Sequence, residues 1–573
     1  MRYAHTLLTA VAALSLSCAH HNTDTVAEPL LPDSNTDAVF DDFSLTANST
    51  VYDALPLLAE SDFYNPILPG WNSDPSICRV NNDFYLVTST FAYYPGVPIF
   101  HSRDLLNWSQ IGYALSRPSQ LLMLGQPVSG GIFAPQIRYN EHNKTFYIIT
   151  TDVGKMGNFF VKATDPRGPW SDPIPLPDVH GIDPSFFFDS DGKAYIVNND
   201  DAEGAPQYDG HRTIRARQFD IATDKTVGPE VVLVDKGANP ADNPIWIEGP
   251  HLYKLNGAYY LMAAEGGTGD WHSEVLFRAD SPLGPYTPLK NNPILTQRDL
   301  PADRPNPVTC AGHADIVDDG AGNYYACFLA CRPVKYGAEN TGRETFMMPV
   351  NFDSDGAPYI TKPGDSVPYI SSIKGAKRGD RVTFGNVDFH DSFDSQTLDL
   401  GWLSLRGPAD SVASLTTRPG SLVLSVRHGN TSDKGIPAFL ARRIPHEAFS
   451  CFVNLSFSPR ETTETAGLVM FKDEDHQYQL CVGRSVEGEV SIQARRVTAS
   501  SPQGEILAQK PLDTNKLRLR IDSPDGLTVS MSFSSDNGES WTTLVDSLDA
   551  AYLSTRDCGG FTGTTIGPFR NAF

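Results

Sequence analysis

The sequence predicts an all-β protein in which a five-bladed β-propeller is followed by a β-sandwich. One strand–turn–strand pattern recurs five times between Asp74 and Tyr325, and its copies follow one another at about the spacing of propeller blades. A composition of 46 Gly, 43 Pro, 30 Phe, 22 Tyr and 7 Trp favours turn-rich β structure over a helical bundle. No convincing long helical pattern separates the copies.

Length and charge limit the classes of partner. The 573 residues carry 68 acidic and 45 basic side chains, a formal net charge of −23. The length predicts two or more domains. A chain this acidic is a poor candidate for binding nucleic acid or anionic lipid, because both require clustered Lys and Arg. A neutral polymer such as a polysaccharide is not repelled and remains a candidate partner.

The segment from Met1 to Cys18 has the features of an export signal. The apolar run Leu7–Leu16 is well short of the roughly 20 residues that a membrane span needs. It leads to Cys18 in a loose bacterial lipoprotein motif, which predicts a lipid anchor; an ordinary cleaved signal with an incidental cysteine is the alternative. We expect an exported bacterial protein, a periplasmic or outer-membrane (cell-surface) lipoprotein. Residues 19–62 are predicted to form an acidic flexible tether.

The other seven cysteines lie in apolar, strand-like runs without the spacing of a metal finger. Because Cys is among the residues most often buried, free buried thiols are the expectation, although an exported protein could form one or two disulfides. The seven are Cys78, Cys310, Cys327, Cys331, Cys451, Cys481 and Cys558.

Each copy of the repeat begins with a small or charged residue, continues into a strand and a polar turn, and ends in a second strand that opens with aromatics. The turns have hairpin chemistry, as in Asn256-Gly257. The copies begin at Asp74, Ala134, Asp183, Gly249 and His313. They predict a propeller domain over residues 63–375.

The repeat predicts where side chains converge. In a propeller the first strand of each blade lines the central channel, so the residues that start these strands meet at its mouth. Three carboxylates, on Asp74, Asp183 and Glu248, would share a small volume there with the imidazole of His313. Each alone could be a turn or strand-end residue. Together they indicate acid/base chemistry, because proximity raises some carboxyl pKa values and lowers others.

At these residues the sequence resembles glycoside hydrolase family 43, the five-bladed β-xylosidases and α-L-arabinofuranosidases. The similarity runs from about residue 63 to the C-terminus. Any one motif is weak, but seven in the family's order are a specific signal. The motifs are Asn65-Pro-Ile-Leu-Pro-Gly70 with Asp74-Pro-Ser-Ile-Cys-Arg79, Phe91-Ala-Tyr-Tyr-Pro-Gly-Val-Pro-Ile-Phe100, Gly130-Gly-Ile-Phe-Ala-Pro-Gln-Ile-Arg138, Gly181-Ile-Asp-Pro-Ser-Phe186, Ile247-Glu-Gly-Pro-His251, Glu265-Gly-Gly-Thr268 and Gly342-Arg-Glu-Thr345.

The resemblance implies a role for each carboxylate. Asp74 matches the general base that activates water, and Glu248 matches the general acid that protonates the leaving oxygen. Asp183 matches the third carboxylate, which orients the acid and tunes its pKa. The family inverts configuration, so the carboxyls of Asp74 and Glu248 are expected to lie about 6.5–9.5 Å apart. Glu248 must stay protonated near neutral pH while Asp74 stays ionised, so their surroundings must differ.

The resemblance also implies substrate contacts. Arg343 matches an arginine that binds sugar hydroxyls, with a strand-end arginine paired with Glu344 as the alternative. Phe91 matches an aromatic wall of the sugar pocket, with plain core packing as the alternative. His313 matches a channel-centre histidine that in some members binds calcium or a water, and a histidine held by hydrogen bonds alone is the alternative. Calcium prefers oxygen ligands, so a single histidine is weak support for it.

Two features depart from the family pattern and leave the exact sugar open. Phe133 stands where many members have Trp, which predicts a smaller pocket wall that still contacts substrate. The polar stretch from Asn198 to Arg212 is similar to one branch of the family, and we expect it to border the pocket.

Residues 385–573 are predicted to form a concanavalin A-like jelly roll after a polar, Gly-rich linker. Two segments alternate as half-buried strands should. In the family this domain packs on the propeller, and a loop from it sometimes narrows the active site. Scaffolding and carbohydrate binding both remain open as its role. The segments that carry the resemblance are Asp388-Phe-His-Asp-Ser-Phe393 with Trp402, Arg418-Pro-Gly-Ser-Leu422, Ala466-Gly-Leu-Val469 and Gly560-Phe-Thr-Gly563.

The hypothesis that follows is an exo-acting, inverting glycoside hydrolase that releases terminal α-L-arabinofuranose, β-D-xylose or both from plant cell-wall polysaccharides or oligosaccharides. A non-catalytic carbohydrate-binding propeller lipoprotein is one alternative, although a lectin has no need of three convergent carboxylates. An endo-arabinanase is another, although it would need an open groove. No cofactor is expected to be required, although a structural calcium in the propeller channel is possible. The protein is expected to contact the membrane only through the lipid anchor.

Overall fold

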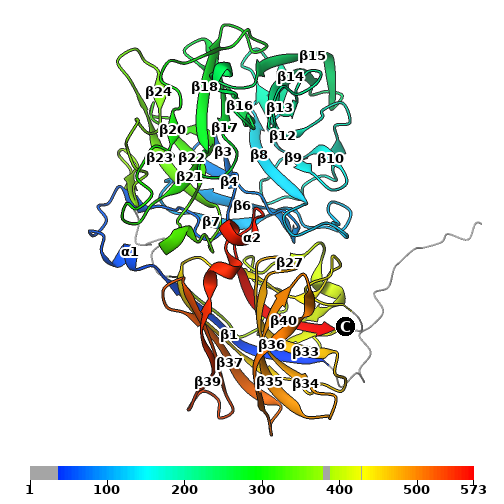
Figure 1. Cartoon of the computed structure of the whole chain (residues 1–573). Helices are drawn as coiled ribbons and strands as arrows, with labels where there is room; N and C mark the ends of the chain where they lie inside the picture. The colour runs from blue at the N-terminus through cyan, green and yellow to red at the C-terminus, as the bar shows by residue number, and fades with distance from the viewer. Residues whose placement is uncertain (1–36, 378–386, 427–428) are drawn as a thin grey trace, which may run out of the picture. The chain divides into compact units, whose positions relative to one another are not determined.

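The computed structural model describes residues 37–377, 387–426 and 429–573 (Figure 1). Within these ranges the chain is almost entirely β structure, which confirms the predicted fold class, and none of the described helices is long and apolar enough to cross a membrane. The export signal and Cys18 lie outside the described residues. The helical segments are short turns: α1 (Thr50–Asp53), α2 (Thr555–Cys558), η1 (Pro240–Asp242), η2 (Lys335–Gly337), η3 (Ala409–Ser411) and η4 (Ala550–Leu553).

Five antiparallel sheets form the blades of the predicted propeller, each built from strands consecutive in the sequence apart from the separately paired β5. Blade 4 carries the additional short strand β20, which pairs with β18. The strands are, in blade 1, β3 (Ser76–Val80), β4 (Asp83–Val87), β6 (Gly96–Ser102) and β7 (Ser109–Leu115); in blade 2, β8 (Ile132–Asn140), β9 (Thr145–Asp152), β10 (Gly157–Ala163) and β11 (Ile174–Pro175); in blade 3, β12 (Ile182–Phe188), β13 (Ala194–Asp201), β14 (Arg212–Asp220) and β15 (Lys225–Asp235); in blade 4, β16 (Glu248–Leu255), β17 (Ala258–Glu265), β18 (Ser273–Ala279), β19 (Thr287–Pro288) and β20 (Leu295–Thr296); in blade 5, β21 (Thr309–Asp318), β22 (Tyr324–Cys331), β23 (Glu344–Phe352) and β24 (Pro358–Tyr359).

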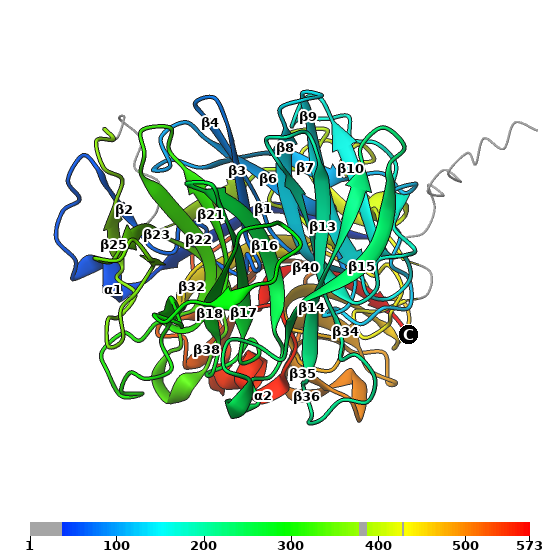
Figure 2. The ribbon, with the colours of Figure 1, turned by 90° about the horizontal axis from the view of Figure 1, so that it is seen from above.

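The first strands of the five blades form a closed ring. Each packs against the first strands of its two neighbours, in the order β3, β8, β12, β16 and β21, and β21 returns to β3. Figure 2 shows the sheets arranged around this common centre. The two ends of the propeller segment are joined where β2 (Asp62–Tyr64) pairs with β25 (Ile370–Ser372). Each inner strand is the end strand of its sheet, and closure of the ring packs it between the first strands of the two neighbouring blades.

Local sequence explains the hairpins and the packing between blades. At the β16–β17 turn, Asn256 and Gly257 both have positive φ (52° and 82°), the conformation that a two-residue hairpin loop requires and that this residue pair favours. Large aromatics fill the space between neighbouring blades. Between blades 2 and 3, Tyr147, Phe160 and Phe186 pack as one buried cluster, with edge-to-face ring pairs 5.4–5.5 Å apart.

The C-terminal part is a β-sandwich of two antiparallel sheets around an apolar core. Alternating burial along strands such as β32 and β37 shows that one face of each points into this core. The first sheet contains β28 (Ala413–Ser414), β29 (Leu422–Leu424), β1 (Ala38–Asn48), β26 (Val387–Asp391), β32 (Ala448–Ser456), β37 (Lys516–Ser523), β38 (Thr528–Ser534) and β39 (Thr542–Asp549); the second contains β30 (Ala438–Phe439), β31 (Arg442–Arg443), β40 (Thr565–Ala572), β33 (Glu464–Phe471), β34 (Gln477–Arg484), β35 (Val490–Thr498) and β36 (Ser501–Pro511).

The predicted flexible tether over residues 19–62 is wrong from residue 37 onward. Ala38–Asn48 forms β1, an inner strand of the first sandwich sheet that pairs with β26, β29 and β32. Its apolar residues alternate on both sides of a bulge between Asp41 and Ser44: Phe40 is buried before the bulge, Phe43 is buried within it, and Leu45 is buried after it. The bulge shifts the period-two pattern of apolar residues by one residue. In an acidic sequence, this interruption makes the strand difficult to recognise from its hydrophobic pattern.

The propeller and the sandwich are joined by hydrogen bonds between buried groups. β27 (Ser404–Leu405) pairs with β5 (Tyr93–Tyr94) of the propeller. The guanidinium of Arg406, fully buried, donates to the backbone oxygen of Gln126 at 2.7 Å. The polar, Gly-rich linker is predicted over about residues 362–388, and residues 378–386 of it lie outside the described residues.

All seven cysteines that the structure describes are free, and every one except Cys558 is buried. The expectation of free buried thiols is therefore confirmed for the described residues, and the disulfide alternative is not supported.

Candidate active site

The five residues that start the repeat adopt the same uncommon backbone conformation. Asp74, Ala134, Asp183, Gly249 and His313 all have positive φ, between 37° and 57°. In blades 2 to 5 the strand pairing shifts register within a few residues of this position. A side chain at positive φ is strained for residues other than Gly, and such strain is tolerated where the surrounding fold imposes it. The repeat therefore presents one equivalent position from each blade to the centre of the ring.

Asp74 lies among positive and hydrogen-bonding groups from other segments. Its carboxylate accepts a hydrogen bond from the Ser89 hydroxyl at 2.5 Å, lies 3.4 Å from Arg343 Nη1 and lies 4.0 Å from His313 Nδ1. Burial alone would raise the pKa of Asp74, but Arg343, His313 and the Ser89 hydroxyl outweigh it and hold this pKa below its ordinary value. Asp74 is thus kept ionised, as a base must be.

Glu248 has the opposite environment. Burial raises its pKa well above the ordinary value, and the negative charges of Asp183 and Asp74 raise it further. Asp183 is itself buried, which raises its pKa, and its carboxylate accepts a hydrogen bond from the Gly249 N–H at 3.1 Å. Burial and two nearby negative charges disfavour the charged form of Glu248, so it keeps its proton more readily than an ordinary glutamate does. The site therefore favours the ionised form of Asp74 and the protonated form of Glu248, the combination that acid/base hydrolysis needs.

Arg343 and three phenylalanines line the same site. The guanidinium carbon of Arg343 lies 5.7 Å from the ring centre of Phe91 and 5.1 Å from that of Phe561, and its Nε is buried without a hydrogen-bond partner among the described residues. Phe133 meets Phe91 and Phe561 edge-to-face at 5.5 Å. Because Arg343 faces Asp74 and not Glu344, the strand-end alternative does not hold; Glu344 pairs with Arg332.

Phe561 belongs to the sandwich domain, and sequence reasoning did not assign it to the site. Its N–H donates to the Ser129 hydroxyl at 2.9 Å, although the two residues are far apart in the sequence. The only available signal was the Gly560–Gly563 motif together with the expectation that a loop of this domain narrows the active site. In the structure, Phe561 is the residue of this loop that lies at the site.

His313 lies beside Asp74, as the repeat predicted, but it offers calcium a weak set of ligands. Among the described residues, no group of three clustered candidate ligands includes His313. One imidazole nitrogen and one carboxylate are far from the six to eight oxygens that calcium takes. Calcium in the channel stays a prediction, and no catalytic step depends on it.

His272 packs beside the site and was also missed from the sequence. Its Nδ1 donates to the Cys310 backbone oxygen at 2.8 Å, and burial lowers its pKa to about 3, so it is neutral. A Cβ at Gly312 would lie 2.7 Å from the His272 ring, which explains the glycine next to His313.

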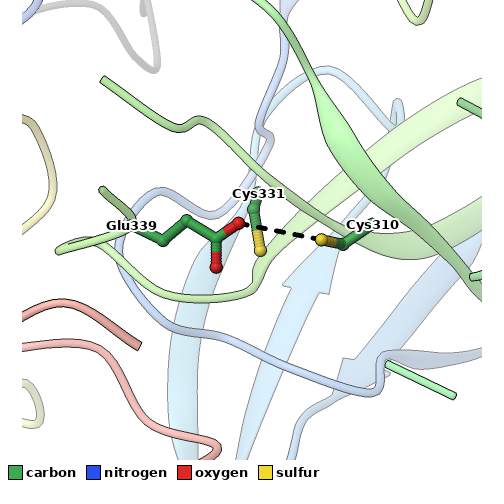
Figure 3. Close-up of side chains that lie close together, drawn as sticks. All are labelled: Cys310, Cys331 and Glu339. Carbon is green, nitrogen blue, oxygen red and sulfur yellow. Dashed lines mark hydrogen bonds between the residues drawn. The ribbon is translucent and has the colours of Figure 1, made fainter. Parts of the chain in front are cut away.

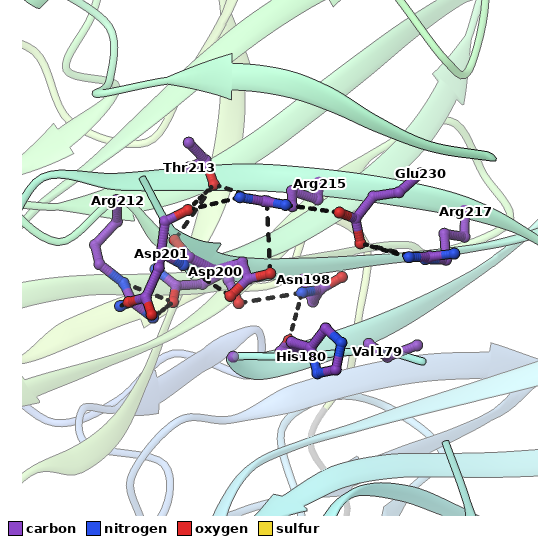
Figure 4. Close-up of polar contacts among 12 residues, drawn as sticks. Val179, His180, Asn198, Asp200, Asp201, Arg212, Thr213, Arg215, Arg217 and Glu230 are labelled. Carbon is purple, nitrogen blue, oxygen red and sulfur yellow. Dashed lines mark hydrogen bonds and ion pairs between the residues drawn. The ribbon is translucent and has the colours of Figure 1, made fainter. Parts of the chain in front are cut away.

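The polar stretch Asn198–Arg212 reaches the segment that carries Glu248. Arg212 donates to the Asn199 side chain at 2.7 and 3.1 Å, and its guanidinium lies 5.1 Å from the ring centre of Trp246. The Asn199 amide donates in turn to the backbone oxygen of Ile247, next to Glu248. Figure 4 shows Arg212 in the surrounding network of ion pairs. The charge of Arg212 opposes the rise in the pKa of Glu248.

Both parts of the chain match known protein families. The family model described as "Glycosyl hydrolases family 43" matches residues 63–358, which is more than half of the chain. The chain belongs to glycoside hydrolase family 43. A second model, "Beta xylosidase C-terminal Concanavalin A-like domain", matches residues 390–572. These matches confirm the resemblance seen in both parts of the sequence.

Several family 43 proteins are similar over most of the chain. The non-reducing end α-L-arabinofuranosidase of Bacteroides ovatus is 36% identical over 89% of this chain and 92% of its own. The xylosidase/arabinosidase of Butyrivibrio fibrisolvens is 38% identical over 89% and 95%. A crystal structure of a GH43_12 retrieved from a capybara gut metagenome superposes with a TM-score of 0.85 at 39% identity, over 94% of this chain and 99% of the other.

Replacing Asp183 with asparagine should move the basic limb of the pH–activity profile to lower pH. A general acid at Glu248 would work only while protonated, so activity should be lost as the pH rises through its pKa, and the charge of Asp183 helps keep that pKa high. Removing the charge lowers the pKa of Glu248. The measurement is kcat/KM across pH for wild type and Asp183→Asn. Exposed Asp191→Asn is the control, and an unmoved basic limb in Asp183→Asn would argue against the tuning role.

Replacing Phe561 with alanine should lower kcat/KM about 10-fold, mainly by raising KM, since an aromatic wall contributes on the order of 1 kcal/mol per ring contact. Phe452 of the sandwich, which packs under Arg518, provides a matched control in Phe452→Ala. Steady-state kinetics on a nitrophenyl pentoside measures both variants. Equal KM values for Phe561→Ala and wild type would remove Phe561 from the substrate pocket.

Proposed function

We propose that this family 43 enzyme is exo-acting and inverting, and that it releases terminal pentoses, α-L-arabinofuranose or β-D-xylose or both, from plant cell-wall polysaccharides or oligosaccharides. The observation that carries the proposal is the pair Asp74 and Glu248, buried in one site with pKa values displaced in opposite directions. Neither a lectin nor a scaffold requires that pairing.

The proposed reaction takes place in one displacement. Glu248 gives its proton to the glycosidic oxygen as the bond to the anomeric carbon breaks. Asp74 takes a proton from a water that attacks the same carbon from the opposite face, so the sugar leaves with inverted configuration. Arg343, beside Asp74, can donate to ring hydroxyls through its unpartnered Nε. The separation of the two carboxyls, about 6.5–9.5 Å for inversion, stays a prediction.

Exo action is supported by the closure of the site on the sandwich side. Phe561 meets Phe91 and Phe133 over Arg343, which suits a pocket for a chain end better than an open groove for the middle of a polymer. The names of the similar proteins, non-reducing end arabinofuranosidase and xylosidase/arabinosidase, agree with pentose release.

A panel of nitrophenyl glycosides tests the proposal. The α-L-arabinofuranoside and β-D-xyloside should be hydrolysed, while the β-D-glucoside, with its additional hydroxymethyl group, should not. Arabinan digested by the enzyme should give arabinose without intermediate oligosaccharides. Oligosaccharides as the first products would favour the endo-arabinanase, and binding of arabino-oligosaccharides without turnover would favour the lectin.

We also propose export with a lipid anchor at Cys18, a residue outside the described part of the chain. The support is the sequence from Met1 to Cys18 alone. Metabolic labelling with a palmitate analogue should mark the wild-type protein and not Cys18→Ser. Equal labelling of the two would contradict the anchor.

A further inference from the structure

Two thiols and one carboxyl converge in blade 5, apart from the catalytic carboxylates. Cys310 lies on β21, Cys331 ends β22, and Glu339 lies in the loop that leads to β23. Each offers one ligand atom, and the three atoms all lie within 4.8 Å of one another (Figure 3). The Cys310 thiol donates to Glu339 Oε1 at 3.7 Å.

The fold holds the three side chains together from independent directions. Thr309 pairs with Cys331 across the β21–β22 ladder, which brings Cys310 next to Cys331. The loop after β22 is closed by a hydrogen bond from the Gly342 N–H to the Glu339 oxygen at 3.3 Å. The cluster thus joins two strands and a loop, and its arrangement does not depend on one flexible segment.

We infer that Cys310, Cys331 and Glu339 form a binding site for a thiophilic divalent cation of the zinc type. Zinc takes thiolate sulfur at about 2.3 Å and carboxylate oxygen at about 2.0–2.2 Å in a tetrahedron, which brings neighbouring ligand atoms to roughly 3.5–4 Å from one another. In the protein, Cys310 Sγ lies 3.7 Å from Glu339 Oε1, and all three ligand atoms lie within 4.8 Å of one another. A hard cation such as calcium prefers oxygen ligands to thiolate sulfur.

Two of the three groups border open space that could hold a solvent ligand. Cys310 and Glu339 line a cavity of about 930 Å³, bounded also by Asp270 and Arg556. Three protein ligands and one solvent position describe an open site, in contrast to the closed four-ligand sites of structural zinc. The cavity also gives the ion a path of entry.

Burial and nearby charges act on the protonation of these groups. Burial raises the pKa of Glu339 and the negative charge of Asp270 raises it further, while Cys310, Lys472 and Arg556 lower it. Cys310 and burial raise the pKa of Cys331, and Glu339 adds to the rise. Glu339 and Cys331 are therefore inclined to keep their protons. A cation would displace protons from its ligands and release them to solvent, so binding should tighten as the pH rises.

The position of the cluster gives it a consequence for the active site. Cys310 lies shortly before His313 on β21, and Glu339 lies in the same loop as Arg343. A cation that ties β21, β22 and the loop together would hold the backbone that presents both groups. The structure thus assigns the cation a positioning role, with no contact to the sugar.

A second cluster, Asp473, His476 and Cys558 in the sandwich, must be distinguished from the first, because its ligand atoms also lie within 4.8 Å of one another. It is less buried and has one thiol where the first cluster has two; His476 Nδ1 lies 2.8 Å from Asp473 Oδ1, and Cys558 donates to the Ser554 backbone oxygen at 2.8 Å. In the test, this second cluster is the alternative binding site for the cation, from which binding at the first cluster must be distinguished.

The experiment is a Co²⁺ titration of the reduced full chain, followed by competition with Zn²⁺. Cobalt bound to thiolate gives a charge-transfer band, and tetrahedral cobalt gives visible bands, so coordination is read without any assay of activity. We expect one equivalent to bind, Zn²⁺ to displace it, and Tm to rise with Zn²⁺ concentration. Cys310→Ser and Cys331→Ser should lose the thiolate band, and Glu339→Gln should bind at least about 10-fold more weakly.

Cys327→Ser is the matched control, since Cys327 is a buried thiol on the same strand as Cys331. It should bind as wild type does. If the cysteine variants of the cluster fold poorly, Glu339→Gln and His476→Ala decide the matter. Loss of the thiolate band in His476→Ala but not in Glu339→Gln, or absence of the band in the reduced wild type, would overturn the inference.

Discussion

Asp74→Asn should lower kcat/KM for every pentoside by roughly 10²–10⁴-fold, the contribution of a positioned general base. Asparagine keeps the size of the side chain and can still accept the Ser89 hydrogen bond, but it cannot take a proton from water. The loss should appear mainly in kcat, because the substitution leaves Arg343 and the phenylalanines, the expected sugar-binding residues, in place. Steady-state kinetics with a nitrophenyl arabinofuranoside and xyloside measures it.

Two additions make this test specific to the base. Azide, which attacks without giving up a proton, should partly restore turnover of Asp74→Asn and give a glycosyl azide. Asp191→Asn, in the exposed turn of blade 3, should retain wild-type rates. If Asp74→Asn kept more than about a tenth of the wild-type rate, Asp74 would not be the base.

Glu248→Gln should produce a loss that depends on the leaving group. A general acid matters most when the departing alcohol is a poor leaving group, so hydrolysis of xylobiose or an arabino-oligosaccharide should fall by roughly 10²–10⁴-fold. A dinitrophenyl glycoside leaves without protonation and should be affected far less. The comparison of the two substrates in one variant isolates the proton transfer from any general effect on folding.

Glu141→Gln provides the control for Glu248→Gln, since Glu141 is an exposed glutamate paired with Lys144 in a propeller turn. It should leave both substrates unchanged. A uniform loss on both substrates in Glu248→Gln would indicate a binding or structural role for Glu248, and no loss on either would assign the acid elsewhere.

The convergence of the proposed catalytic residues could be predicted from the sequence because each of them belongs to a local pattern. Three of the residues each start one copy of the repeat: Asp74, Asp183 and His313. Glu248 directly precedes the residue that starts a fourth copy. A closed ring of blades brings these starting positions together, regardless of the length of the loops between them. The structure adds the shared positive φ at these starts. The opposite pKa shifts of Asp74 and Glu248 depend on interatomic distances and burial, which a sequence motif does not specify.

The parts that sequence missed are those that depend on contacts between distant segments. β1 pairs Phe43 with Asp391, and Phe561 reaches Ser129, in each case between segments far apart in the chain. The acidic composition of β1 and the bulge in it led to the prediction of a flexible tether in place of a strand. Phe561 lay in a motif that indicated only the domain, because its role arises from where the sandwich meets the propeller.

The most direct test of the proposed mechanism is proton NMR of the first sugar released from a nitrophenyl β-D-xyloside, recorded before mutarotation. One displacement by a water that Asp74 activates, opposite a bond that Glu248 protonates, predicts that α-D-xylose appears first and the β anomer follows by mutarotation. Initial formation of β-D-xylose would mean two displacements through a covalent intermediate, and would contradict the assignment of Asp74 as a base acting on water.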